Sequence, residues 1–293
     1  MTSVALLGKF LWILFLSFSF GLYTMVLYVL VKGRRKKFKA GFFVLMFWLG
    51  LADLLTLLLI YFLLQLAPFP YRQDSVWMAT LQQIVIYWLY YVQALANVAI
   101  ALNRLTAVIT PFQHEPFWNK NINKAVAAMY LPPLLYTLPM LLPSGRSTYD
   151  SQLHPRFQAN STGYFLYREV GFALEQLVVA PLLFVMYLVV CVGVIRARRK
   201  VESRVLKPSN MKQEKKEHRM AIVGGAIVST FELVEVTYFL AVFVDPFFYL
   251  ICRLLWTVFT VINPYLLLVF CADVRKQFKA TFLTRAAAAA GPN

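Results

Sequence analysis

Residues 77–109, WMATLQQIVIYWLYYVQALANVAIALNRLTAVI, decide the fold class of this chain. No charged residue stands between Trp77 and Arg104. An apolar run of about 20 residues or more is long enough to cross a bilayer. A helix satisfies its own backbone hydrogen bonds in hydrocarbon, whereas a barrel strand would be short and would alternate apolar and polar residues. The segment therefore predicts a membrane-spanning helix.

The rest of the chain repeats this pattern. Hydrophobic residues make up 60% of the 293 residues and charged residues only 14%, and the mean hydropathy is +0.64. These values predict an all-α membrane protein with a seven-transmembrane helix bundle, formed by a single domain over residues 1–285. The expected spans are 9–31, 41–66, 77–109, 123–143, 169–195, 219–243 and 247–270.

A short amphipathic helix is expected at 272–283, after the seventh span. Val274, Phe278 and Phe282 stand four residues apart and would form one apolar face on the inner leaflet. Cys271, just before this helix, is a candidate for palmitoylation, although an unmodified thiol is the simpler expectation. The stretch 286–293 is a low-complexity tail with no recognisable function.

Basic residues indicate the orientation. The chain has 29 Lys and Arg against 13 Asp and Glu. All but six of the basic residues fall in the linkers 32–40, 110–122 and 196–218, in the adjoining span ends, or after 271. Because basic loops stay in the cytoplasm, the amino terminus is expected outside and the tail inside a plasma membrane. The sequon at Asn160 then faces outward and predicts glycosylation.

The same charge distribution narrows the function. Basic loops beside membrane spans favour anionic inner-leaflet lipid as a partner, not nucleic acid. The three cysteines and three histidines show no spacing typical of a metal site, so neither a metal, a cofactor nor an enzyme is predicted. A retinal protein would need a lysine in the seventh span, and residues 247–270 contain none.

The end of the third span carries the most informative motif. Residues 101–107, ALNRLTA, place Arg104 about 40 Å along the helix from Trp77, at the cytoplasmic mouth. Pro111 and then Trp118 follow this arginine in the sequence. A lone arginine there could simply extend to the headgroups, or it could donate to a docking partner.

In these residues, and in the segments 38–53 and 263–278, the chain resembles the nematode serpentine chemoreceptors of class V or class gamma. That resemblance covers nearly the whole chain. It implies a divergent rhodopsin-like G-protein-coupled receptor for a small molecule or secreted signal. It further implies that Asn103, Arg104 and Pro111 couple to a heterotrimeric G protein. Asn103 stands where an acid is usual, and the loop 144–168 lacks the usual tethering cysteine.

Asp53 lies near the middle of the second span, where a carboxylate is costly and is therefore paired or functional. Its best partner by depth is Asn263, which precedes Pro264 in the seventh span. The resemblance implies an activation switch around water and sodium at Asp53, Asn263 and Pro264. The alternative is a hydrogen bond that only joins two helices.

Further charged and aromatic residues in the outer halves of the spans are candidates for the ligand pocket. Glu235 could pair with Arg253, which would make these charges structural, and aromatics such as Tyr90 could line the pocket. The same buried acids could also serve an ion-coupled transporter or a ligand-gated channel, the alternative to a receptor. The pocket candidates are Tyr91, Glu175, Glu232, Glu235, Tyr238, Arg253 and Trp256.

Overall fold

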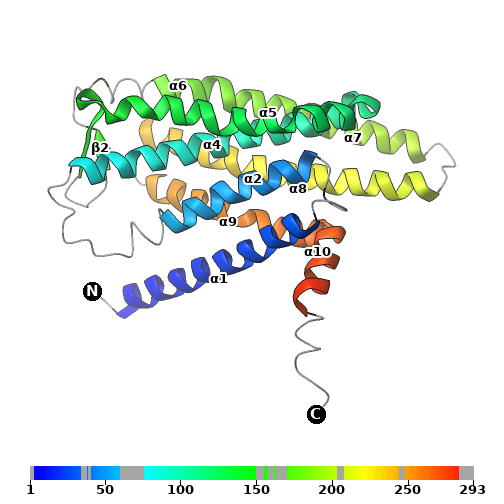
Figure 1. The fold of residues 1–293 in the computed structure, drawn as a ribbon, viewed down its shortest axis with the longest axis horizontal. Coiled ribbons are helices and arrows are strands. Elements are labelled where there is room, and N and C mark those ends of the chain that lie inside the picture. The colour runs from blue at the N-terminus through cyan, green and yellow to red at the C-terminus, as the bar shows by residue number, and fades with distance from the viewer. Residues whose placement is uncertain are drawn as a thin grey trace, which may run out of the picture.

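The computed structural model describes residues 3–33, 38, 41–59, 76–149, 155–157, 162, 170–202, 208–243 and 248–283. Seven long helices in these ranges form one elongated bundle (Figure 1). The helices are α1 Ser3–Gly33, α2 Gly41–Thr56, α4 Val76–Ile109, α5 Pro111–Thr137, α7 Ala180–Glu202, α8 Pro208–Phe243 and α9 Phe248–Phe270.

Shorter elements occupy the two ends of the bundle. Between α5 and α7 lie two 3-10 turns, Leu138–Leu141 and Pro143–Gly145, the strands β1 Ser147–Tyr149 and β2 Pro155–Phe157, the short helix α6 Gly171–Leu174, and the π-helical turn Glu175–Val179. The strands pair antiparallel, with Thr148 opposite Arg156. After α9 come α10 Ala272–Phe278 and the π-helical turn Lys279–Leu283.

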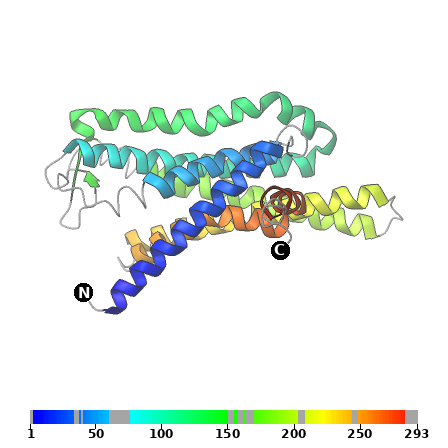
Figure 2. The same ribbon diagram turned by 60° about the horizontal axis from the view of Figure 1, so that its bottom comes forward.

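The bundle is arranged around α4. This helix packs against α2, α5, α7 and α8, and both strands lie against it. α1 crosses the bundle obliquely (Figure 2) and contacts α2, α9 and α10. α10 bends away from α9 by 93°, as expected for an amphipathic helix that follows the inner leaflet.

Two helices begin before the membrane spans that the sequence predicts for them. α5 begins at Pro111 instead of residue 123, and α8 begins at Pro208 instead of 219, so most of two expected loops is helical. Proline is favoured in the first turn of a helix, because its fixed φ suits the helix and the missing N–H would be unpaired there anyway. Hydropathy detects the part of a helix inside lipid and misses its polar extension into water.

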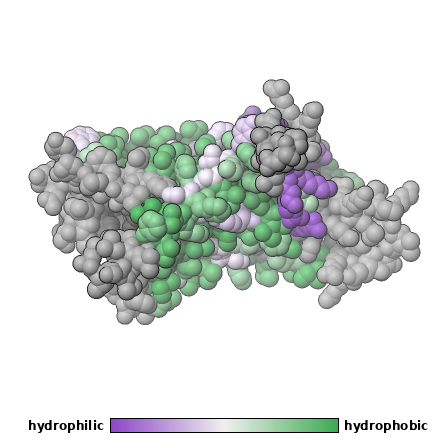
Figure 3. Space-filling view, turned by 90° about the horizontal axis from the view of Figure 1, so that it is seen from below, coloured by the Kyte–Doolittle hydropathy of each residue, from purple (hydrophilic) through white to green (hydrophobic). Residues whose placement is uncertain are grey.

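Membrane-crossing helices are also found by length and composition. Among the described residues five helices are long and apolar enough, and α9 with α10 makes a sixth if the bent pair counts as one span. α5 has 27 residues, enough to cross a membrane, but the polar stretch 113–124 lowers its hydropathy. A broad hydrophobic band crosses the middle of the surface in Figure 3, with hydrophilic residues gathered to one side.

The loop after α5 is held to α4 without a disulfide. The backbone N–H of Ser147 in β1 donates to Thr80 Oγ1 over 3.1 Å. The Arg146 guanidinium carbon lies 5.1 Å from the centre of the Trp77 ring, within the range of a cation–π contact. These two contacts join the first turns of α4 to β1 and the residue before it.

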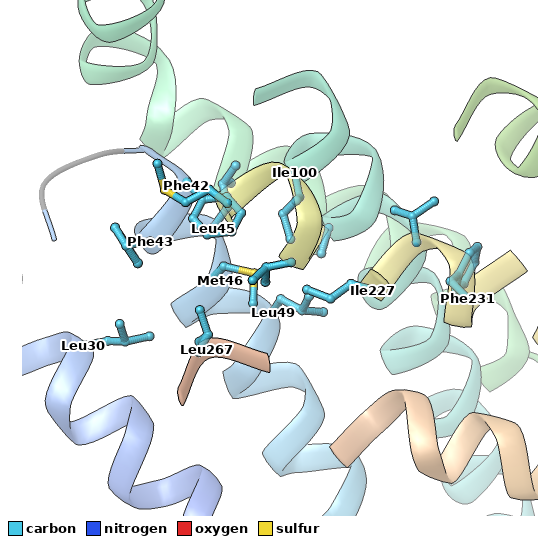
Figure 4. Close-up of a cluster of buried hydrophobic side chains, with 14 of the residues drawn as sticks. Leu30, Phe42, Phe43, Leu45, Met46, Leu49, Ile100, Ile227, Phe231 and Leu267 are labelled. Atoms are coloured by element: carbon cyan, nitrogen blue, oxygen red, sulfur yellow. The ribbon is translucent and has the colours of Figure 1, made fainter. Parts of the chain in front are cut away.

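The hydrophobic core fills the bundle between α2, α4, α8 and α9. Figure 4 shows side chains from these helices meeting around Met46 and Leu49, and α1 contributes Leu30 at one side. Leu49 is fully buried, and so are Ile100 and Ile227. Core residues of this kind fix the rotation of each helix, and with it the direction in which the polar side chains of the same helix point.

We expect Leu49→Ala to destabilise the protein by about 2–5 kcal/mol, because deleting a buried isobutyl group leaves a cavity. The measurement is the thermal unfolding midpoint of the detergent-solubilised protein. Leu188→Ala is the matched control, since Leu188 is 53% exposed on the outer face of α7. Equal shifts for the two variants would contradict the burial of Leu49.

Candidate functional site

The centre of the bundle contains a carboxylate bound by three helices. Asp53 of α2 is fully buried. The Tyr23 hydroxyl of α1 donates to its Oδ2, Gln93 Nε2 of α4 donates to Oδ1 over 2.7 Å, and Asn263 Nδ2 of α9 donates to Oδ2 over 2.6 Å. The contact between Asp53 and Asn263 that the sequence predicted is therefore present, and its role in activation stays a prediction.

Local sequence explains why Tyr23 reaches this carboxylate. Gly50 lies one turn before Asp53, and a Cβ there would lie 2.7 Å from Leu27 Cδ2 and 3.1 Å from Tyr23 Cε2. Glycine at this position therefore lets α1 approach α2 closely without a shift of the Leu27 or Tyr23 side chains. Pro264 stands inside α9, where it removes one backbone hydrogen bond directly after Asn263.

Gln93 connects Asp53 to the outer half of the bundle. Its Oε1 accepts a hydrogen bond from Trp256 Nε1 over 3.1 Å, while its Nε2 donates to Asp53. The Trp256 ring meets the Tyr90 ring edge-on at 6.0 Å. The Tyr90 hydroxyl donates to Glu235 Oε1. An unbroken series of contacts therefore runs from the mid-bundle carboxylate to the outer acidic residues.

The outer acidic cluster consists of Glu175 and Glu235, which are 4% and 1% exposed. The Tyr90 hydroxyl contacts both carboxyl groups. Gln176 Nε2 donates to Glu235 Oε2. Glu175 Oε1 is buried and has no hydrogen-bond partner among the described residues.

The π-helical turn explains how Glu175 faces inward. Pro181 follows this turn, and a proline disturbs the helical hydrogen bonds of the preceding turn, because it lacks an N–H and its ring clashes with the carbonyl four residues earlier. Widening Glu175–Val179 into a π turn relieves that conflict. Such turns shift the register of side chains and are common at functional sites.

The remaining pocket candidates differ in position. The Tyr91 ring meets the Tyr136 ring at 5.2 Å, and both hydroxyls pack against Gly171. Glu232 is half-buried, and its Oε1 has no partner among the described side chains. Tyr238 is half-buried. The side chain of Arg253 lies outside the described residues, and so does the predicted pair with Glu235.

The inner end of α4 holds Arg104 inside the bundle. Arg104 is 2% exposed, its guanidinium donates to Asn103 Oδ1 through Nε over 3.2 Å and through Nη2, and its Cζ lies 4.5 Å from the centre of the Phe42 ring. Asn103 thus accepts from the arginine in place of an acid.

The corner between α4 and α5 is tied together beside Arg104. Trp118 Nε1 donates to Thr106 Oγ1 over 2.8 Å, and His114 Nδ1 lies 3.0 Å from the same hydroxyl. Trp118 also packs against Gly41 at the start of α2. Pro111 starts α5 directly after this corner and fixes the direction in which the chain turns.

The structure describes one of the two predicted modification sites and not the other. Asn160 lies outside the described residues. Cys271 is 6% exposed, at the bend between α9 and α10. The thiol is therefore largely covered by the bundle, and the state of Cys271 stays a prediction.

No group of three His, Cys, Asp or Glu side chains that could hold a metal occurs in the described part of the chain. A sodium ion does not need such a group, because hard cations are bound through oxygen atoms of carboxylates, amides and carbonyls. The Asp53 carboxylate and Asn263 Oδ1 would supply them, because that amide oxygen is buried and has no partner among the described residues. Asn97 Oδ1, on the turn after Gln93, is a second buried oxygen of this kind.

Sequence reasoning missed Tyr23, Gln93 and Gln176 as functional residues, and it treated Tyr90 only as a general lining residue. The sequence does contain a signal for Gln93, since an amide in the middle of an apolar span needs a hydrogen-bond partner. Tyr23 is one of 16 tyrosines, and nothing in the sequence separates it from those in the interface.

We expect Gln93→Leu to lower stability by about 1–3 kcal/mol, because it leaves Asp53 Oδ1 and the Trp256 N–H without their partners. Thermal unfolding in detergent measures the loss. Gln113→Leu, at an exposed position of α5, is the matched control. A Gln93→Leu protein as stable as the control would show that these hydrogen bonds contribute nothing.

Comparison with known proteins agrees with this architecture. The solved structure of squid rhodopsin is similar, with a TM-score of 0.68 over 90% of this chain and 81% of that chain, at 14% sequence identity. A search of curated proteins by sequence finds no match. The family model described as serpentine type 7TM GPCR chemoreceptor Srv matches residues 12–283. The chain therefore belongs to the Srv family of serpentine seven-transmembrane chemoreceptors.

Proposed function

We propose that this protein is a chemosensory receptor of the plasma membrane. It binds a small external ligand in the outer half of the bundle and activates a heterotrimeric G protein at its cytoplasmic face. The observation that carries the proposal is the series of contacts from Glu235 through Tyr90, Trp256 and Gln93 to Asp53. It links the outer cluster to a carboxylate that joins three helices.

The contacts give the ligand a route to the helix arrangement. A ligand shifts a conformational equilibrium only through different affinities for the two states. Moving Tyr90 or Glu235 to meet a ligand would disturb the edge-on contact with Trp256 and the hydrogen bond from Trp256 to Gln93. Because Gln93 also binds Asp53, the packing of α1, α2 and α9 around that carboxylate responds.

At the inner end, the G protein would meet Arg104. This side chain is buried in the present arrangement, against Phe42 and Asn103. An opening of the inner helix ends would expose it to carbonyl or carboxylate groups of the partner. Phe112, at the start of α5, is 96% exposed, and a fully exposed phenylalanine beside this corner suits a docking surface.

The membrane environment follows from the same orientation. With the amino terminus outside, the basic first turns of α8 and the basic residues of α10 lie at the inner leaflet, where they attract anionic lipid. Arg275 Nη1 also donates to the carbonyls of Leu268 and Val269 and so supports the bend before α10.

We expect Arg104→Ala to abolish G-protein activation, because the guanidinium supplies the donors for the partner. Nucleotide exchange on a purified G protein measures activation, and surface labelling measures expression. Lys120→Ala, at an exposed position of α5, should activate normally. Unchanged exchange by an expressed Arg104→Ala receptor would defeat the proposal.

We expect Asp53→Asn to alter signalling or its dependence on sodium, because an amide cannot accept from three donors as the carboxylate does. Exchange assays with and without sodium measure both effects. Tyr23→Phe, which removes one donor and keeps the charge, is the companion variant. If Asp53→Asn changes only stability, the carboxylate is a structural link between helices.

A further inference from the structure

Among the described residues, the acidic cluster has fewer hydrogen-bond donors than its carboxyl oxygens can accept. Tyr90 has one hydroxyl proton and contacts two carboxyl groups, so it can donate to only one of them at a time. It donates to Glu235 Oε1, and Gln176 supplies Glu235 Oε2. Glu175 Oε1 therefore remains buried without a donor among the described residues.

The side chains that the structure describes around the cluster include no cation. Neither Glu175 nor Glu235 contacts a lysine or arginine among the described side chains, and both are more than nine-tenths buried. Adjacent negative charges repel strongly in a medium of low dielectric constant. A cation that also donates hydrogen bonds would satisfy the unpaired oxygen and remove this repulsion.

The surroundings suit an organic cation better than a bare metal ion. The rings of Trp256, Tyr90, Tyr91 and Tyr136 follow one another edge-on, with centroids 5.2–6.0 Å apart. Faces of aromatic rings attract ammonium groups, and their edges pack against the carbon atoms of a ligand. A divalent metal would need several more oxygen ligands.

We propose that Glu175 and Glu235, with Tyr90, form the ammonium subsite of the receptor's pocket, and that the external ligand is a small protonated primary or secondary amine. Its N–H groups donate to Glu175 Oε1 and to Glu235, and its carbon skeleton packs against Tyr91 and Trp256. This inference rests on the proposed function for the location of the pocket, and it names the class of ligand.

Thermal unfolding of the purified wild-type receptor in detergent tests the ligand class without any G protein. The probes are methylammonium and 2-phenylethylammonium, with 2-phenylethanol as the neutral counterpart of similar shape. We expect an ammonium probe to raise the unfolding midpoint by about 5 °C at about 100 times its dissociation constant, and the alcohol to have no such effect. No shift with either ammonium ion, or an equal shift with the alcohol, would overturn the proposal.

Two variants test whether the ammonium probe binds at this acidic cluster. Glu175→Gln and Glu235→Gln should each weaken binding of the ammonium probe by about 10- to 100-fold, the loss expected for a charge-assisted hydrogen bond. Glu115→Gln, at an exposed position near the start of α5, should bind as the wild type does. Unchanged affinity in both cluster variants would place the amine elsewhere and refute the subsite.

The stability of the receptor without any probe gives an independent test of the role of Glu175. If Glu175 is kept for a ligand, Glu175→Gln should raise the unfolding midpoint without any probe, because it removes one of two adjacent buried acids that are unfavourable together. A lowered midpoint would make Glu175 a structural residue and overturn the proposal. The two proposals fail separately: a receptor that binds amines but activates no G protein refutes only the proposed function, and one that signals to neutral compounds alone refutes only the amine.

Discussion

The carboxylate of Asp53 is the constraint on which the rest of the bundle depends. A charged or polar group in hydrocarbon must find partners inside the protein, since lipid offers none. Asp53 finds donors on α1, α4 and α9. These helices are far apart in the sequence, and each must have the correct rotation and depth for its side chain to reach. Hydrophobic packing alone tolerates small rotations, whereas directional hydrogen bonds do not.

The hydrogen bonds around Asp53 also couple the centre of the bundle to the residues around Glu235. Gln93 uses both ends of its amide, one for Asp53 and one for Trp256, so neither contact can change without the other. Trp256 in turn packs edge-on against Tyr90, which donates to Glu235. Buried polar networks behave as units because each bond orients the next. A disturbance at the outer acids therefore has a physical path to the helix contacts at mid-depth.

The sequence predicts the all-α, seven-helix fold, because hydropathy reports directly on lipid contact. It also predicts the contact between Asp53 and Asn263, since both are costly at that depth and few other partners exist. It does not predict Tyr23 or Gln176, because their contacts depend on helix rotation and on a π turn that no periodic pattern reveals. The helices α5 and α8 extend beyond the spans that hydropathy predicts, because Pro111 and Pro208 begin helical turns among polar residues, where hydropathy carries no signal.

The inner end shows how a missing charge can be replaced. An acid before Arg104 would hold the guanidinium in an ion pair, which is costly to break when buried. Asn103 offers a neutral oxygen instead, and the Phe42 ring adds a cation–π contact. Both contacts are weaker than a buried ion pair. The contacts of Trp118 with Thr106 and Gly41 tie α2, α4 and α5 together beside Arg104, and the donors around Asp53 join the helices at mid-depth.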